Sequence, residues 1–212
     1  MRSLQRKPWP KDQQGCTKSP SPSNYKAFLV DLEDNFGQYC CYCERRELVD
    51  VEHVVPQSSA PLLVCNWHNL LLACPKCNRD YKKEKNSGRA GYIWPDTSDS
   101  FDLYEYHADG SVSEKKSVHP RTQAEVKKTI ELFHLNGKLR NLRCEQWDIA
   151  SDDLKDYKNG TRTVERIVKN VVANGYWSVW MTVFKDYPEV TQKIADAFPG
   201  TLPKYCTPPA NP

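Results

Sequence analysis

Two cysteine pairs, each spaced Cys-x-x-Cys, constrain this chain more than any other feature of its 212 residues. The first pair is Cys40 and Cys43, and the second is Cys74 and Cys77. Zinc takes four soft ligands in a tetrahedron, and a gap of two residues lets both sulfurs of one tight turn reach the same ion. Buried free thiols are the alternative, but two such pairs flanked by polar residues favour a zinc site.

The first pair leaves one alternative open, because Cys41 also lies two positions before Cys43. Cys40 is preferred because its spacing matches that of the second pair. Four cysteine ligands leave no open coordination position, so this zinc is expected to be structural and to fold a segment with little core of its own. Any chemistry must then come from other residues.

Composition is that of a water-soluble protein, with 39% hydrophobic and 27% charged residues. No apolar run approaches the roughly 18 residues of a membrane helix, and the basic start has no apolar stretch after it. We therefore expect a cytoplasmic chain without a membrane partner. In that compartment metal binding is favoured over a disulfide framework, and the other five of the nine cysteines are expected to be free.

The formal net charge is only +3, but the basic residues are clustered. Residues 1–30 hold six basic residues against a single acid, and residues 75–90 hold six against two. Such clusters suit a polyanion such as nucleic acid, although a solvated surface is the alternative for any basic run.

The patterning predicts an α+β chain in three parts. Residues 1–23 form an extended basic arm, which either docks or stays mobile. Residues 24–118 hold a helix over 24–36, the cysteine pairs, and a hairpin with a strand over 101–106 and a turn at Asp109-Gly110. Residues 119–212 are mainly helical and are expected to pack on the module or on a partner. Their predicted helices are one that Asn136-Gly137 closes, a pair over 161–185 separated at Gly175, and a short one after Pro188.

An aromatic stripe marks the second helix of that pair, with Trp177, Trp180 and Phe184 at helical spacing. A partner-binding surface is one interpretation, since large aromatics dominate interface energetics. An ordinary core stripe is the preferred one.

The motifs between and after the cysteine pairs carry the functional signal. They are Val51-Glu52-His53-Val54-Val55-Pro56, then Trp67-His68-Asn69-Leu70-Leu71, then Asn78-Arg79 directly after Cys77. This order of elements resembles the HNH nuclease superfamily, as does the nine-residue separation of Asn69 and Asn78. The resemblance covers residues 40–86 and implies a ββα-metal core, here with a four-cysteine zinc site inside a mainly helical chain.

The resemblance also implies a role for each residue. His53 deprotonates a water molecule, because a neutral imidazole is the natural base near pH 7. Glu52 and Asn78 supply oxygen ligands to a divalent ion, magnesium with manganese as an alternative. Asn69 braces the loop and orients His53, whereas Arg79 and Lys82 hold the phosphate backbone.

Each role has an alternative. His53 could be a structural histidine in its apolar run, Asn78 could cap a helix, and His68 is structural or faces phosphate. The chain also departs from the superfamily pattern at two positions. Glu52 replaces the commoner Asp, and Tyr81 occupies the usual basic position, with Lys82 four residues after Asn78 as its substitute.

A closer resemblance extends over most of the chain. Tyr42-Cys43-Glu44, Glu52-His53, Trp67 before His68, and Ala73-Cys74-Pro75-Lys76-Cys77-Asn78 are similar to the PtuB-like HNH nucleases of Septu-type and retron anti-phage defence systems. That resemblance implies a nuclease controlled by an SMC-like or ABC-like ATPase subunit, the PtuA-like partner of such systems.

Three functions compete on these residues. The favoured one is a metal-dependent endonuclease, and the main alternative is a non-catalytic zinc-stapled module that binds nucleic acid or protein. A restriction-type enzyme acting alone would need a target-recognition region, for which residues 94–114 are poorly suited. DNA is the expected target, but the site reads only a phosphodiester, so RNA stays open.

Overall fold

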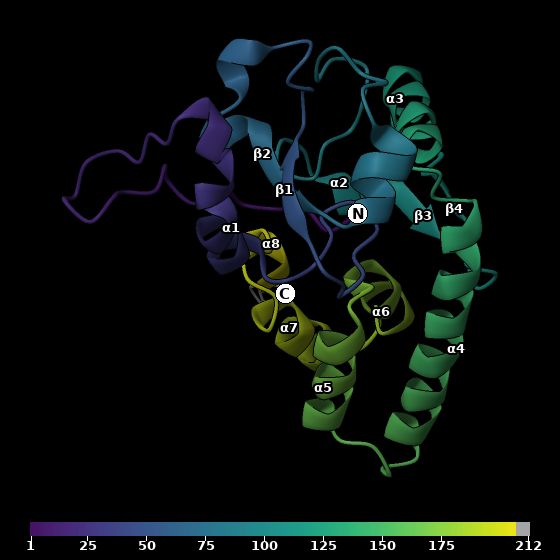
Figure 1. Ribbon diagram of the computed structural model, residues 1–212. Coiled ribbons are helices and arrows are strands. Elements are labelled where there is room, and N and C mark those ends of the chain that lie inside the picture. Colours follow the sequence, from purple (N-terminus) through teal and green to yellow (C-terminus); the bar gives the residue numbers. More distant parts are fainter. Residues whose placement is uncertain (207–212) are drawn as a thin grey trace.

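The computed structural model describes residues 1–206 and shows a mixed α+β chain that is mostly helical (Figure 1). Its strands are β1 (Asp50–His53), β2 (Leu70–Ala73), β3 (Tyr104–Tyr106) and β4 (Val112–Glu114). Its α-helices are α1 (Leu29–Phe36), α2 (Ser100–Leu103), α3 (Pro120–Leu132), α4 (Lys138–Lys158), α5 (Val164–Asn174), α6 (Trp177–Val183), α7 (Pro188–Asp196) and α8 (Pro203–Cys206). Three 3-10 segments are η1 (Pro22–Phe28), η2 (Pro61–Leu63) and η3 (Trp67–Asn69), and η4 (Lys76–Lys82) is π-helical. Within residues 1–206, none of the helices has the length and apolar character that a membrane crossing requires.

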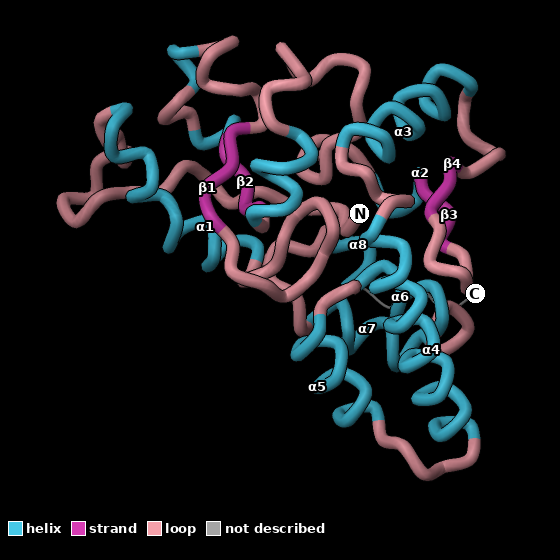
Figure 2. Tube along the Cα trace, turned by 45° about the vertical axis from the view of Figure 1, so that its right-hand side comes forward, coloured by secondary structure: helices cyan, strands magenta, loops and turns pink. Residues whose placement is uncertain are grey.

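β1 and β2 form a two-stranded antiparallel sheet, well separated from the second strand pair (Figure 2). Its register pairs Glu52 with Leu71 and His53 with Leu70. β2 is buried along its whole length, as its continuous apolar run requires, and α1 packs against it. Glu52 and His53 therefore lie at the end of β1, which is held in the core by its pairing with the buried strand β2.

β3 and β4 form the predicted hairpin, with Asp109-Gly110 in its turn. Gly110 has a φ of 75°, and a Cβ there would lie 2.1 Å from the carbonyl oxygen of Arg140. The prediction of a strand from residue 101 is wrong, because residues 100–103 form α2. That helical turn packs the Phe101 ring edge-on against Trp177, with 4.9 Å between the ring centroids.

The helices over 24–36, 161–185 and beyond Pro188 correspond to η1 with α1, to α5 with α6, and to α7. Gly175 separates α5 from α6, as predicted. The long helix α4 has no counterpart among the predicted helices. Few of its residues are buried, Leu139 and Ala150 among them, so its apolar pattern is faint.

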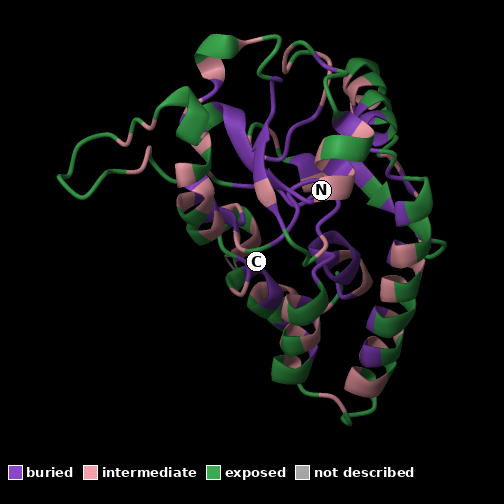
Figure 3. Cartoon of the chain, in the orientation of Figure 1, coloured by how far each residue is buried: buried purple, intermediate pink, exposed green. Residues whose placement is uncertain are grey.

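Buried apolar side chains form two clusters, and Figure 3 shows buried residues on β1 and β2 and again on α6. The first cluster surrounds β1, β2 and the cysteine pairs and takes in α1 and α3. The second is built from α4 to α7. Trp177, Trp180 and Phe184 are completely buried in the second cluster, so the aromatic stripe is a core stripe and the partner-surface interpretation is wrong.

Glu44 connects the first cysteine pair to the second cluster. It follows Cys43 directly and has a φ of 65°, the left-handed conformation that few residues other than glycine adopt. Its carboxylate accepts hydrogen bonds from the Ser178 amide at 2.9 Å and the Ser178 hydroxyl at 2.6 Å. Its carbonyl accepts one from the Tyr176 amide at 3.0 Å. Glu44 thus caps the start of α6 and joins the two clusters.

The first residues run through the interior. Ser3 and Leu4 are buried, and the Arg6 guanidinium donates to the carbonyls of Trp67 and Leu70 at 2.7 and 2.8 Å. Arg6 also forms an ion pair with Asp96 at 2.7 Å. Residues 11–17 are exposed and form the loop that projects from the body in Figure 1.

Candidate functional site

The four cysteines of the two pairs converge. Cys40, Cys43, Cys74 and Cys77 are all buried, and their sulfur atoms lie within 4.8 Å of one another. Cys43 Sγ and Cys74 Sγ are 3.8 Å apart. A zinc–sulfur distance of about 2.3 Å in a tetrahedron gives a sulfur–sulfur separation of about 3.8 Å, so the cluster fits a structural zinc.

The structure decides between Cys40 and Cys41. Cys41 lies outside the cluster, its amide donates to the Leu72 carbonyl at 2.9 Å, and burial raises the pKa of its thiol to about 12. Cys40 is therefore the first-pair cysteine that joins the cluster, the one that spacing favours. The Arg45 guanidinium lies 3.9 Å from Cys74 Sγ and provides positive charge beside four ligands that become thiolates when they bind zinc.

The cysteine cluster positions the helical segment that carries the second asparagine. Cys77 lies within η4, and the Asn78 amide donates to the Cys74 carbonyl at 3.0 Å. The hydrogen bond from the Cys41 amide to the Leu72 carbonyl connects the segment of the first pair to β2 in the same way. Strand and helical segment are thereby held against each other by a common anchor.

His53, at the end of β1, is 7% exposed and held at both ring nitrogens. Nε2 lies 2.9 Å from the Val64 carbonyl oxygen, and Nδ1 lies 3.2 Å from the Gln57 side-chain nitrogen. Because a carbonyl only accepts, Nε2 carries the hydrogen and Nδ1 carries the lone pair. Burial lowers the pKa of His53, which keeps the ring neutral near pH 7.

Glu52 is 2% exposed and faces a buried lysine. The ammonium of Lys82 lies 2.7 Å from Glu52 Oε1 and also donates to the His53 carbonyl at 2.8 Å. The Tyr42 hydroxyl contacts the same carboxylate oxygen at 3.4 Å. Burial raises the pKa of Glu52, and the neighbouring Lys82 ammonium opposes that effect.

These residues open on one cavity of about 380 Å³. Its lining consists of Tyr25, Val51, Glu52, His53, Pro56, Gln57, Asn78, Arg79, Lys82, Lys83 and Glu84. The structure thus brings together Glu52, His53, Asn78 and Arg79 from β1 and η4. The ring of Tyr25 meets His53 edge-on, with 4.6 Å between centroids.

Glu52 and Asn78 are suitable donors for a divalent ion. Within residues 1–206, Glu52 Oε2 and the Asn78 side-chain amide make no hydrogen bond, and both residues line the cavity. A carboxylate and an amide oxygen are hard donors of the kind that magnesium takes, with water completing its shell. The residues present therefore fit such an ion.

Asn69 does not line the cavity and instead bonds the loop that follows His53. Its Oδ1 accepts from the Val55 amide at 2.8 Å, and its Nδ2 donates to the carbonyls of Val55 and Leu63 at 3.0 and 3.3 Å. Leu63 and Val64 are adjacent, so the same asparagine supports the carbonyl that orients His53.

The structure does not support the phosphate contact predicted for Lys82. Lys82 is 1% exposed and its ammonium is occupied by Glu52 and the His53 carbonyl, whereas Arg79 is exposed and forms no ion pair among the described residues. Lys82 does line the same cavity as Asn78, as its helical spacing predicts. It does so as a buried residue, without reaching the surface.

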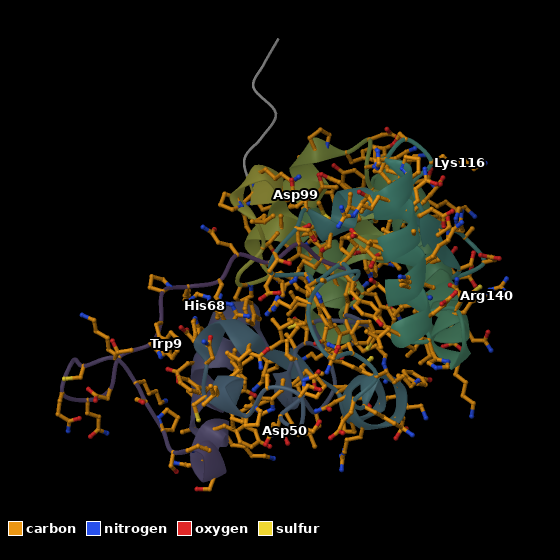
Figure 4. All side chains as sticks on the ribbon, turned by 90° about the horizontal axis from the view of Figure 1, so that it is seen from above. Trp9, Asp50, His68, Asp99, Lys116 and Arg140 are labelled. Atoms are coloured by element: carbon orange, nitrogen blue, oxygen red, sulfur yellow. The ribbon has the colours of Figure 1, made fainter. Side chains whose placement is uncertain are left out.

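Sequence reasoning missed several residues near the site. Tyr25 and Gln57 contact His53, and the buried Asn86 donates to the Val54 carbonyl at 2.7 Å. Gln57 follows Pro56 directly, so its place near the motif was a usable signal. Tyr25 and Asn86 lie outside the motifs, and only the fold brings them close. His68 is exposed and packs beside Trp9, as Figure 4 shows, away from the cavity lining.

No protein-family model matches the chain. Among curated proteins, it is similar to the Septu protein PtuB of Bacillus thuringiensis, with 31% identity over 158 residues. The match covers 71% of this chain and 55% of the relative, so the chain spans about half the length of that protein. The aligned stretch is much longer than the motif region alone. The chain is therefore a distant homologue of the Septu protein PtuB.

Proposed function

We propose that this chain is a metal-dependent HNH endonuclease that hydrolyses phosphodiester bonds of nucleic acid, as the effector of a Septu-type anti-phage defence system. The observation that carries the proposal is the arrangement of His53. Its Nε2 is bonded to the Val64 carbonyl, its Nδ1 carries the lone pair, and the same cavity holds Glu52 and Asn78.

His53 Nδ1 accepts the proton of the attacking water. This requires the Gln57 amide, 3.2 Å from Nδ1 in this structure, to leave so that water takes its place. Nε2 stays bonded to Val64, which fixes the ring and stabilises the imidazolium that forms. Asn69 positions this unit by holding the backbone of Val55 and Leu63.

Glu52 and Asn78 hold the catalytic divalent ion, magnesium by preference. That ion, when bound, neutralises charge on the phosphate and on the leaving oxygen. Arg79, exposed at the rim of the cavity, contacts a substrate phosphate. The four-cysteine zinc holds the scaffold and takes no part in the chemistry.

The defence role and the partner are proposed from the similarity to the Septu protein PtuB. We propose an SMC-like or ABC-like ATPase as the controlling subunit, because a free and constantly active nuclease would damage its own cell. DNA is the proposed target, and RNA is the alternative that the experiment below separates.

The test is Mg²⁺-dependent cleavage of plasmid DNA and of tRNA, by the purified chain alone and together with a PtuA-like ATPase, the proposed partner. His53→Ala is expected to lower the cleavage rate about 10² to 10⁴-fold, the usual contribution of a general base. His68→Ala is the matched control, because His68 is exposed and does not line the cavity. Cleavage that survives His53→Ala contradicts the catalytic assignment. Binding without any cleavage, alone or with the ATPase, favours the non-catalytic zinc-stapled module instead.

A further inference from the structure

Two adjacent lysines at the end of η4 have opposite surroundings. Lys82 is buried, whereas Lys83 is exposed, and both line the cavity that holds His53. The segment η4 ends between them: Lys83 has a φ of 51°, and its amide donates to the Asn78 carbonyl at 2.9 Å, which closes the last turn. One lysine therefore points into the protein and the other reaches the rim.

Lys82 is placed to hold the Glu52 carboxylate in a fixed position. Its ammonium bonds Glu52 Oε1 at 2.7 Å and the His53 carbonyl at 2.8 Å, so it links the side chain of one site residue to the backbone of the next. Glu52 and Lys82 are 2% and 1% exposed, so water does not compete for this pair. Only Oε2 of the Glu52 carboxylate is left for another partner.

The surroundings of Lys83 suit contact with a polyanion. Its side chain forms no hydrogen bond or ion pair within residues 1–206, and neither does that of Arg79. Both border the same cavity: Arg79 lies within η4, and Lys83 directly follows its last residue. A free ammonium and a free guanidinium at one cavity mouth form an electrostatic site for phosphate groups.

We propose that the two lysines divide the work of the site: Lys83, together with Arg79, binds backbone phosphates flanking the scissile bond, and Lys82 is a positioning residue that holds Glu52 for the divalent ion. The proposal rests on the proposed function. It replaces the phosphate contact that sequence alone predicted for Lys82.

The phosphate half is tested by DNA binding in the His53→Ala background, so no turnover is needed. The probe is a fluorescein-labelled 20-base-pair duplex, and anisotropy gives Kd over a range of salt concentrations. Lys83→Ala is expected to reduce the slope of log Kd against log salt by about 0.9 and to weaken binding about eightfold at 0.1 M salt, the loss of one phosphate contact.

Lys82→Met is expected to keep the slope of the parent. Lys116→Ala is the matched control, since Lys116 is an exposed lysine far from Asp50 and β1 (Figure 4). A slope unchanged by Lys83→Ala, or reduced by Lys82→Met, overturns this half of the proposal.

The positioning half is tested with Mn²⁺ alone, counted as free ion by electron paramagnetic resonance. Lys82→Met is expected to weaken Mn²⁺ binding about 10 to 100-fold, the usual cost of losing a residue that supports a metal ligand, whereas Lys83→Ala is not. Lys82→Arg keeps the buried cation but displaces its donor, so it is expected to weaken Mn²⁺ binding measurably, though less than Lys82→Met. Should Lys82→Met fail to fold, Lys82→Arg carries the test. Unchanged Mn²⁺ affinity in the folded Lys82 variant overturns this half.

Failure of the proposal and failure of the proposed function are separable. Hydrolysis of bis(p-nitrophenyl) phosphate by the unsubstituted chain with Mg²⁺ reports on the chemistry without flanking phosphates. The anisotropy series reports on Lys83 whether or not that hydrolysis occurs.

Discussion

The hydrogen bonds of single residues determine which atoms face the cavity and which of them can accept a proton. The Val64 carbonyl selects which nitrogen of His53 carries the hydrogen, and Gln57 covers the other nitrogen. His53 and Asn78 were identifiable because motif spacing places them, but Lys82 was assigned the wrong surroundings. Sequence cannot tell which of two adjacent lysines faces the interior. A π-helical segment makes this harder still, because its wider turn shifts every following side chain relative to an α-helix.

Asn69 provides a prediction on stability at this scale. Asn69→Ala removes the partners of the Val55 amide and carbonyl, both in a buried segment, and should lower the free energy of unfolding by about 2 to 3 kcal/mol. Urea denaturation measures it. Asn24→Ala, at an exposed asparagine, is the control and should change little. A loss below about 1 kcal/mol for Asn69→Ala would show that water forms the hydrogen bonds to the Val55 amide and carbonyl in place of Asn69.

Elements far apart in the chain are tied together through Asp96. Its carboxylate pairs with Arg6 at 2.7 Å and with Arg89 at 2.9 Å, so it joins the first residues to the loop before α2. The sequence left the early segment open between a docked and a mobile arm, because its polar composition holds too few apolar residues to show a buried face. The helix α4 was missed for a similar reason, since its long charged surface hides a narrow buried edge.

Asp96 also predicts a pH dependence. Burial works to raise the pKa of Asp96, but Arg89 and Arg6 outweigh it and bring the pKa below the usual 3.8. The folded carboxylate thus holds its proton less tightly than the unfolded one, and its stabilising contribution is present above pH 3.8 and lost as pH falls through the lower folded value.

Thermal unfolding from pH 7 to pH 2 is the measurement, because the contribution is lost below pH 3.8. Asp96→Asn should lower the unfolding temperature at pH 7, and the gap to the parent should close in acid. Asp34→Asn serves as the control, because the Asp34 pair with Lys7 is largely exposed and should be worth little. A gap that is constant with pH would mean that Asp96 acts through packing and not through its charge.

The whole molecule has two apolar clusters joined beside the cysteine site. Glu44 follows Cys43 and caps α6, so it connects the cysteine segment directly to the helical half. The cysteine site itself was predictable from spacing alone. Its link to α6 was not, because Glu44 and Ser178 lie 134 positions apart and no sequence pattern pairs them.

Removal of the metal should therefore disturb both clusters. We expect about one zinc per chain, and expect a strong zinc chelator to destabilise the β1–β2 region and α6 together. Hydrogen exchange of amides in both regions, with and without chelator, is the measurement.

Cys74→Ser should reproduce the effect of the chelator. Cys144→Ser should not, because Cys144 lies outside the cluster. Loss of protection confined to residues near the cysteines would show that Glu44 does not transmit the change to α6.

The edge-on contact between Tyr25 and His53 has a consequence for modularity. Tyr25 belongs to η1, before the first cysteine pair, so the surroundings of His53 are assembled from segments that a motif search would not select together. A fragment cut at the motif boundaries, or a graft of those motifs onto another scaffold, would keep the four clustered cysteines and lose one wall of the cavity around His53. The smallest fragment that preserves this cavity is therefore longer than the motifs by which it is found.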